Sequence, residues 1–456
     1  MKLTAIIPKD GRLCSSWYIL FVVNFFIMGV IRYYAPPLPI SLVVEVFYII
    51  CIFHSMNIAK NEGNAKRVSN VMMVFYLPWL TYAILEAGNL SSELDYNTIV
   101  TRWFAEVRTM AFQVIYGMLI CAAIFVKKDQ IKTMYKFWGI CIIVCTIKTL
   151  IQQKVGFDTA ENIFLIDAAR THFVNGIIRY FSLFSDAANY GCNMAATTAI
   201  FGAVTLSCKK KMEKIYFAII TLCALYGMLA SGTRTGIFVL AVGGIIYALL
   251  SKRISALITT AIVGGAFFSI LMFTNIGQGN SMIRRMRSAF SADDASVSVR
   301  EVNQIAMKRY IDELPLGLGA GIRNGDVPQS NKNYFLSVVA PDSTWVYVNI
   351  HYGHMGKYLF LFSFLGMCFY AGYIVFFKIR DPELRGLLAG LTSGATAMVV
   401  AGYANQIMLQ FPNCFLFFGQ LMIVYLGPDI DKRMRKQQKE KDKLLLNGEL
   451  ENSTVS

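Results

Sequence analysis

The sequence predicts an all-α fold: a polytopic transmembrane bundle of about 12 spans with a large, partly helical periplasmic loop. Hydrophobic residues make up 55% of the 456 residues and charged residues 16%, whereas a soluble chain carries about 25% charged residues. About 12 spans of about 20 residues need about 240 apolar residues, and the composition supplies them. The short loops between the apolar runs are alternately rich and poor in lysine and arginine, as in multi-pass membrane proteins.

Each predicted span is a long apolar run. The first follows Lys2, Lys9 and Arg12 and lacks a small-residue cleavage site, so we expect a retained helix rather than a removed signal peptide. The runs occupy residues 13–31, 38–58, 68–87, 109–126, 137–153, 188–206, 215–230, 236–250, 254–273, 355–377, 386–404 and 411–427.

The basic loops set the predicted orientation. Lysine-rich segments such as 127–136 and 209–214 fall in alternate loops together with both chain ends. Because lysine and arginine collect in cytoplasmic loops, we expect a multi-pass membrane protein with both termini in the cytoplasm. The same rule accounts for the net charge of +15, so we expect membrane lipid and no nucleic acid as a partner.

This topology divides the chain into four parts. In the longest outer segment, apolar residues recur at i+4 spacing from Val302 to Leu314, and this spacing predicts an amphipathic helix. A loop of this length is usually functional or disordered. The parts are a transmembrane bundle at 1–273 with an outer segment at 154–187, the periplasmic loop at 274–354, three C-terminal spans at 355–427, and a charged cytoplasmic tail at 428–456, a frayed helix or a disordered segment.

Residues that commonly hold metals or form disulfides are scattered along the chain. The ten cysteines lie mostly within apolar runs and form no CxxC pair, so we expect small core residues. The four histidines are too dispersed for a metal site. Asp429 and Asp431 resemble a metal-binding DxD motif, but they fall at the cytoplasmic start of the tail. The sequence therefore predicts neither a metal nor another cofactor.

Arginines gather on the predicted outer face. Arg179 and Asp186 precede the sixth span, and Asn189 lies in its first turn. Arg234 lies in the short turn Ser-Gly-Thr-Arg-Thr-Gly between the next two spans. A single arginine near hydrocarbon can simply extend its side chain to water. Several guanidinium groups on one face suit an anion, because the planar fork grips phosphate with two hydrogen bonds and keeps its charge.

The long outer loop adds further arginines and a run of glycines. Some of these arginines are expected to be solvated or paired with nearby acidic residues. The glycines of 317–321 lack the strand–helix context of a dinucleotide site, so we expect them to let backbone approach a ligand or another helix closely. The loop arginines are Arg284, Arg285, Arg287, Arg300 and Arg323.

Two residues near the end of this loop are candidate general bases. Asp342 and His351 can each accept a proton near neutral pH given suitable neighbours. On one straight helix they would lie on opposite sides, about 13 Å apart along the axis, so they meet only if the segment bends. The alternative for His351 and His354 is that both are interfacial residues at the end of a span.

In their order and spacing, these outer residues resemble the O-antigen polymerase and O-antigen ligase superfamily. The resemblance covers roughly residues 100–425. It is carried by Arg179…Asp186-x-x-Asn189, by Ser-Gly-Thr-Arg234-Thr-Gly, by Arg300…Leu-Pro-Leu-Gly-Leu-Gly-Ala-Gly, and by Asp342-Ser…Gly353-x-x-Gly356. Members are bacterial inner-membrane glycosyltransferases with about a dozen spans and a large periplasmic loop late in the chain.

The resemblance implies a substrate and a set of roles. Such proteins act on glycans carried on undecaprenyl diphosphate, transferring the glycan to an acceptor hydroxyl with loss of the lipid diphosphate. It implies no metal or cofactor, and it admits a chain-length regulator as a partner. The implied diphosphate-binding residues are Arg179, Arg234, Arg300 and Arg323, with Asp342 or His351 nearest the acceptor and Asp186 and Asn189 in support.

One departure from the family pattern separates its two branches. The ligase branch carries His-Asn about ten residues before Gly-x-x-Gly, and here that place is taken by Asp342 and Ser343. The departure favours a polymerase of O-antigen, capsule or exopolysaccharide repeat units, with an O-antigen ligase as the alternative.

A flippase or transporter of lipid-linked oligosaccharide is the other alternative, since its arginines could grip a diphosphate during passage. We find no convincing internal repeat of the kind common in transporters. Charged residues concentrate in the outer loops, with Glu45 and Lys148 as exceptions. A purely structural subunit would leave the outer arginines unexplained.

Overall fold

The structure, a computed structural model, describes residues 11–34, 40–61, 71–174, 176–276, 278–279, 281–287 and 295–454. Within these residues the chain is almost entirely helical, and two short strands, β1 (Phe173–Val174) and β2 (Ile177–Ile178), pair antiparallel. Seven helical segments are long and apolar enough to cross a membrane. The predicted class, an all-α multi-pass membrane protein, is confirmed at this level.

Most helix ends lie within a few residues of the predicted runs. α11 coincides with the run at 254–273, whereas the run at 109–126 is the second half of a longer segment, Tyr96–Ile124, in which the π-helical turn η5 joins α4 to α5. The α-helices are α1 Ser15–Tyr34, α2 Ile40–Asn61, α3 Val71–Leu85, α4 Tyr96–Val107, α5 Gln113–Ile124, α6 Lys128–Lys154, α7 Thr159–His172, α8 Ala187–Ser207, α9 Lys211–Ala230, α10 Thr235–Ser251, α11 Ile254–Phe273, α12 Ser281–Arg287, α13 Ala295–Asp312, α14 Tyr334–Val338, α15 Thr344–Tyr373, α16 Pro382–Ala404 and α17 Met422–Thr454; the short turns are η4 Glu86–Gly88, η5 Arg108–Phe112, η7 Ile374–Lys378 and η8 Cys414–Gly419.

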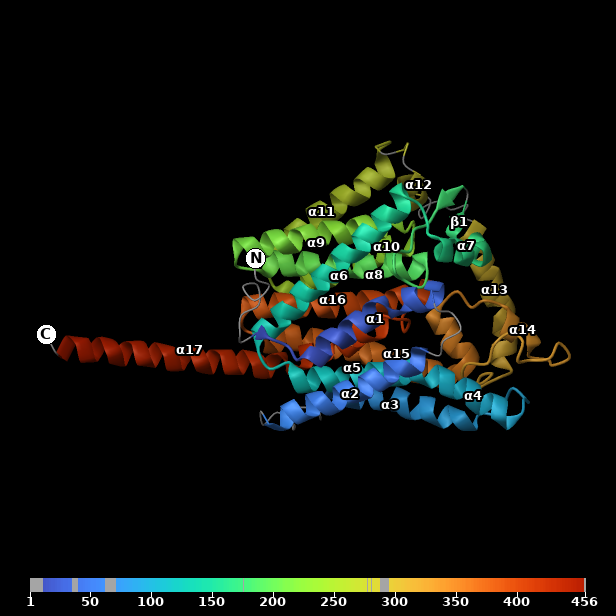
Figure 1. Ribbon diagram of the computed structural model, residues 1–456, viewed down its shortest axis with the longest axis horizontal. Coiled ribbons are helices and arrows are strands. Elements are labelled where there is room, and N and C mark those ends of the chain that lie inside the picture. The colour runs from blue at the N-terminus through green and yellow to red at the C-terminus, as the bar shows by residue number, and fades with distance from the viewer. Residues whose placement is uncertain are drawn as a thin grey trace.

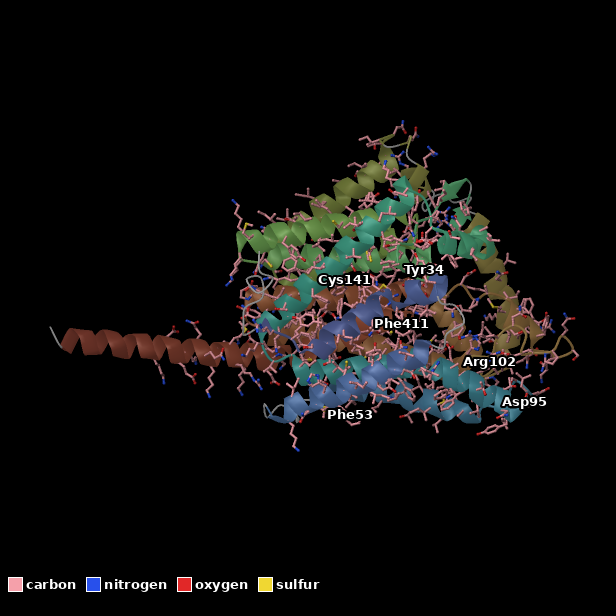
Figure 2. All side chains as sticks on the ribbon, in the orientation of Figure 1. Tyr34, Phe53, Asp95, Arg102, Cys141 and Phe411 are labelled. Carbon is pink, nitrogen blue, oxygen red and sulfur yellow. The ribbon has the colours of Figure 1, made fainter. Side chains whose placement is uncertain are left out.

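α8 lies in the core of the bundle. It packs against α9, α10 and α16, and 17 of its 21 residues are buried. Small residues make this packing close, since a Cβ atom added to Gly243 of α10 would lie 2.6 Å from the Cβ atom of Ala199. At the surface of the bundle, by contrast, large apolar side chains such as Phe53 of α2 are exposed (Figure 2). Exposed apolar side chains are expected where a helix faces lipid.

The two long predicted outer segments lie at the same end of the bundle. Figure 1 shows α7, β1, α13 and α14 gathered there, while α17 leaves the bundle at the opposite end. α17 continues as a helix through most of the predicted tail. Asp431 is buried at its base, where its carboxylate accepts the N–H of Asp381 at 2.9 Å and lies 3.0 Å from Arg435. The DxD-like pair therefore includes a structural anchor for α17.

A second, smaller hydrophobic core holds the long loop together. α13 occupies residues for which the apolar spacing predicts a helix, but Val302 is 64% exposed. Among the side chains of α13 that the structure describes, from residue 302 onward, Met307 and Ile311 are buried, and they pack with Leu318 and Ile350. The buried side of α13 therefore differs from the predicted stripe, because these two side chains pack against the loop and α15.

The glycine run of the loop packs backbone to backbone against a break in α15. Gly353 has φ 67° and ψ −173° inside this helix. On one side of the break, the N–H groups of Leu318 and Gly319 donate to the carbonyls of Ile350 and His351 at 2.7 and 3.1 Å. A Cβ atom on Gly317 would lie 2.5 Å from the nitrogen of Gly353. The close approach expected of these glycines is therefore to another helix.

Candidate functional site

Three arginines from separate parts of the chain surround the turn at 231–234. Arg179 follows β2, Arg234 precedes α10, and Arg285 lies in α12. The Arg179 side chain donates to the carbonyl of Ser231 at 3.3 Å and to Oγ1 of Thr233 at 3.0 Å. Arg285 donates from Nε to the carbonyl of Gly232 at 2.8 Å. We call Arg179, Arg234 and Arg285 the arginine cluster.

The arginine cluster concentrates positive charge at the end of the bundle where the two long predicted outer segments lie (Figure 1). The pKa of Arg285 is lowered to about 10, because the side chain is partly buried and because the cations of Arg179 and Arg234 lie close by. All three groups stay protonated at neutral pH. Like charges held together in this way are stabilised by an anion with several oxygens, which can accept from more than one guanidinium group.

Asp186 and Asn189 organise the start of α8 beside the cluster. The Asp186 carboxylate caps the helix by accepting the N–H groups of Ala188 and Asn189 at 2.8 and 2.9 Å. The Asn189 side chain is fully buried and donates to the carbonyl of Phe411 at 2.8 Å, while its oxygen accepts from Asn413 at 2.7 Å. These two predicted supporting residues therefore act on the backbone around the site.

A cavity of about 370 Å³ opens next to this region. Its walls come from α4 and η5, from the first turn of α15, and from the segment 406–411 that joins α16 to η8. Both polar and apolar side chains line it. The lining residues are Glu106, Thr109, Met110, Arg323, Thr344, Tyr347, Gln406, Met408, Leu409, Gln410 and Phe411. We call this space the Glu106 cavity.

Glu106 places a buried carboxylate in the cavity wall. It is 4% exposed, accepts a hydrogen bond from the Tyr347 hydroxyl at 2.7 Å, and lies 3.8 Å from Nη2 of Arg323. Sequence reasoning missed this residue because the apolar run was taken to begin at 109. A lone carboxylate within a segment that is otherwise apolar enough to span a membrane was the signal that could have found it.

The salt bridge between Arg102 and Asp326 holds Arg323 near Glu106. Arg102 of α4 donates to Asp326 from both Nε and Nη2, at 3.1 and 2.5 Å, and the Asp326 carboxylate also accepts the backbone N–H of Arg323 at 2.8 Å. Figure 2 labels Arg102 toward the outer end of the bundle and Phe411 deeper within it. The glycine-containing loop is thereby tied to α4, so Arg323, a predicted diphosphate residue, borders the cavity.

The cavity and the arginine cluster share structural elements. The Asn405 side chain donates to Thr235, next to Arg234, at 2.7 Å, and its carbonyl accepts from the Thr344 hydroxyl of the cavity at 2.9 Å. On the other side, the Ser185 hydroxyl donates to Gln410 of the cavity at 3.3 Å. The two sites are thus linked indirectly, through Asn405, which hydrogen-bonds both to Thr344 of the cavity and to Thr235, the residue that follows Arg234.

The remaining predicted site residues are not brought together. Asp342 precedes α15 with φ 51°, and within the described residues it shares no hydrogen-bond partner with His351. His351 is buried, with Nδ1 3.0 Å from the carbonyl of Gly319 and its ring 4.2 Å from that of Tyr347. His351 therefore packs against Tyr347, which lines the cavity, and does not line the cavity itself. The side chain of Arg300 lies outside the described residues.

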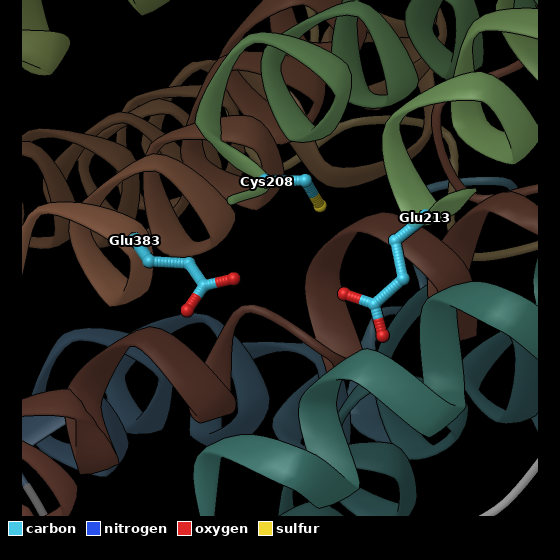
Figure 3. A group of neighbouring side chains, drawn as sticks. All are labelled: Cys208, Glu213 and Glu383. Carbon is cyan, nitrogen blue, oxygen red and sulfur yellow. The ribbon is translucent and has the colours of Figure 1, made fainter. Parts of the chain in front are cut away.

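A group of side chains whose types can bind a metal lies away from the arginine cluster. Cys208, Glu213 and Glu383 have potential ligand atoms within 4.8 Å of one another (Figure 3). Lysines already neutralise both carboxylates, since Lys132 lies 2.5 Å from Glu383 and 3.4 Å from Glu213. Lys128 and Lys136 add further ion pairs at 3.0 Å each. The group is an ion-pair network that ties α6 to α9 and α16.

Comparison with known proteins leaves the site to be interpreted from its own geometry. The site combines an arginine cluster with a nearby cavity, lined by both polar and apolar side chains, that holds a buried carboxylate; this combination suits a phosphorylated substrate that also carries hydroxyl groups. The chain matches no protein-family model, and no curated protein matches it.

Proposed function

We propose that this protein is a polymerase of undecaprenyl-diphosphate-linked oligosaccharide repeat units. The observation that supports it most is the arginine cluster, three cations around one turn, with the Glu106 cavity linked to that turn through Asn405 and Thr235. Such a polymerase needs one region for the diphosphate of the donor and a neighbouring region for the acceptor sugar. The adjacent cluster and cavity meet that need.

The proposed topology has about 12 crossings in a bacterial inner membrane, with both termini cytoplasmic. The segments that would cross are α1, α2, α3, α4–α5, α6, α8, α9, α10, α11, α15, α16 and η8–α17. In this arrangement, the segments 154–187 and 274–354, the latter including the first turns of α15, lie on the periplasmic side, where lipid-linked repeat units would be joined.

The arginines would stabilise the leaving group. During transfer, the bond between the anomeric carbon and the lipid diphosphate breaks, and negative charge accumulates on the diphosphate oxygens. Guanidinium groups fixed in place before the reaction stabilise this charge without reorganisation. Arg179, Arg234 and Arg285 would hold the diphosphate, with Arg323 and Arg300 on the loop as further contacts. Asp342 and His351 are the sequence-based candidates for the acceptor side.

A polymerisation assay tests this proposal. Purified protein in liposomes is given a lipid-diphosphate-linked repeat unit, and products are separated on a gel. We expect a ladder of longer lipid-linked glycans from the unaltered protein, and at least about a 100-fold loss of rate in Arg234→Ala and Arg285→Gln, the scale seen when one transition-state donor is removed. Arg284→Gln is the matched control, because Arg284 is exposed on the same short helix as Arg285.

Other outcomes would redirect the proposal. If the unaltered protein forms no ladder but moves the lipid-linked unit between leaflets, the protein is a flippase. If glycan is transferred once to a lipid acceptor without a ladder, it is a ligase. Equal ladders from the Arg234, Arg285 and Arg284 variants would show that the arginine cluster does not act in the reaction.

A further inference from the structure

Glu106 is a buried carboxylate whose position needs an explanation beyond the binding of a diphosphate. It stands at the end of α4, where the π-helical turn η5 begins, within a segment apolar enough to cross a membrane. Burying a carboxylate there carries a desolvation penalty that its partners must offset, and charged residues kept within membrane spans often mark functional sites. Its partners are Tyr347 at 2.7 Å and Arg323 at 3.8 Å. One explanation is that Glu106 only ties α4 to α15, and the other is that it reacts.

The lining of the Glu106 cavity suits a sugar. Sugar hydroxyls need neighbours that can both donate and accept hydrogen bonds, and hydroxyl and amide side chains can do both. The apolar side of a sugar ring packs against carbon and sulfur. The polar groups are Thr109, Thr344, Tyr347, Gln406 and Gln410, and the apolar ones are Met110, Met408, Leu409 and Phe411.

The cavity also has the right neighbour for a transfer reaction. Asn405 joins Thr235, the residue after Arg234, to Thr344 of the cavity wall. A donor whose diphosphate is held at the arginine cluster therefore has its sugar end next to the segment that lines the cavity. Asp342 and His351 are not among the described residues that line this space.

We infer that the Glu106 cavity binds the acceptor sugar and that Glu106 is the general base; this inference rests on the proposed function. The acceptor oxygen forms a bond to the anomeric carbon of the donor. The bond from that carbon to the diphosphate oxygen breaks, and its electron pair leaves with the lipid diphosphate. The hydroxyl proton passes to the Glu106 carboxylate. The Tyr347 hydrogen bond occupies Oε1, so the proton passes to Oε2, which lies 3.8 Å from Nη2 of Arg323.

The first test is Glu106→Gln in the polymerisation assay. Glutamine keeps the shape and can still accept from Tyr347, so a merely structural role would survive the change. We expect the rate to fall about 100- to 10,000-fold, the usual contribution of a general base, while Glu106→Asp keeps more activity than Glu106→Gln. The matched control is Glu86→Gln, because Glu86 is also buried and hydrogen-bonded, to Asn89 at 2.9 Å, but does not line the cavity.

The outcomes separate this inference from the proposed function. A ladder from the unaltered protein and from Glu86→Gln, with none from Glu106→Gln, supports it. Equal ladders from the unaltered protein and Glu106→Gln overturn the role of Glu106 and leave the polymerase standing. No ladder from the unaltered protein overturns both.

A labelling experiment tests acceptor binding without turnover. A hydrophobic carbodiimide reacts with buried carboxyl groups, and trypsin releases residues 103–108, Trp-Phe-Ala-Glu-Val-Arg, in which Glu106 is the only acidic side chain. Mass spectrometry of this peptide measures the labelled fraction. We expect the soluble repeat oligosaccharide, without its lipid, to reduce labelling of Glu106 severalfold and to leave Glu86 unchanged. Unchanged labelling of Glu106 at saturating oligosaccharide would contradict acceptor binding in this cavity.

Discussion

The hydroxyl of Tyr347 donates a 2.7 Å hydrogen bond to the buried carboxylate of Glu106, a residue 241 positions earlier in the chain. The bond joins α4 to α15 at the wall of one cavity. Arg323 approaches the same carboxylate from the loop, at 3.8 Å. Three distant segments therefore meet at one acidic group.

Binding of a diphosphate should weaken at high pH because Arg285 loses its proton. Burial and the neighbouring cations of Arg179 and Arg234 lower the pKa of Arg285 in the free protein to about 10. Affinity for undecaprenyl diphosphate should therefore change little between pH 7 and pH 9 and fall as the pH rises through about 10. Titration calorimetry in detergent measures it. The variant Arg285→Gln should bind undecaprenyl diphosphate more weakly at neutral pH. Its affinity should fall less than that of the unaltered protein as the pH rises through about 10, because the group that loses its proton is gone.

Arg285→Gln should also leave the free protein at least as stable as before. A base whose folded-state pKa is lowered destabilises the fold at every pH below that value, since the folded state binds its proton less well. Removing the charge should therefore raise the free energy of unfolding, by no more than about 1 kcal/mol because solvent screens a partly exposed group. Thermal unfolding in detergent measures the change. A clear loss of stability would show that its bond to Gly232 outweighs the repulsion.

Gly353→Ala should damage the junction between the glycine loop and α15. An added Cβ atom would overlap the carbonyl oxygen of Pro315, and φ at this position is 67°. We expect a loss of about 1–3 kcal/mol or more, seen as a lower unfolding temperature and loss of the ladder. Gly264→Ala is the control, because no atom lies within 4 Å of a Cβ built there. In that helix alanine should be neutral or slightly stabilising.

The Arg102–Asp326 salt bridge should affect activity more than stability. Arg102→Gln would release the loop that carries Arg323, so the rate of polymerisation should fall. The coupling energy between Arg102 and Asp326, measured in a double-mutant cycle with Asp326→Asn, should be only about 1 kcal/mol, because Arg102 is partly exposed. Unfolding temperatures and ladder assays measure the two effects. The exposed pair of Lys332 and Glu93, 3.3 Å apart, should show almost no coupling. Equal effects of both pairs would contradict a special role for the loop.

The composition and periodicity of the sequence predict the class of this fold because hydropathy and helical spacing are local properties of the chain. Several helices can be placed in this way, and α11 coincides with its apolar run. The burial of α13 could not be predicted to the residue, because Val302 and Ile311 differ in what packs against them and not in their apolar character.

The sequence by itself determined that this is a helical membrane protein and that Arg179 and Arg234 lie in connecting segments between apolar runs. Only the tertiary structure decided that Arg285 joins them, that Glu106 lines a cavity, and that His351 lies behind Tyr347 instead of lining that cavity. The physical reason is that hydrophobic burial and basic loops act within single segments. Contacts between segments depend on how the helices pack, and a charge acquires its function from the neighbours that packing supplies.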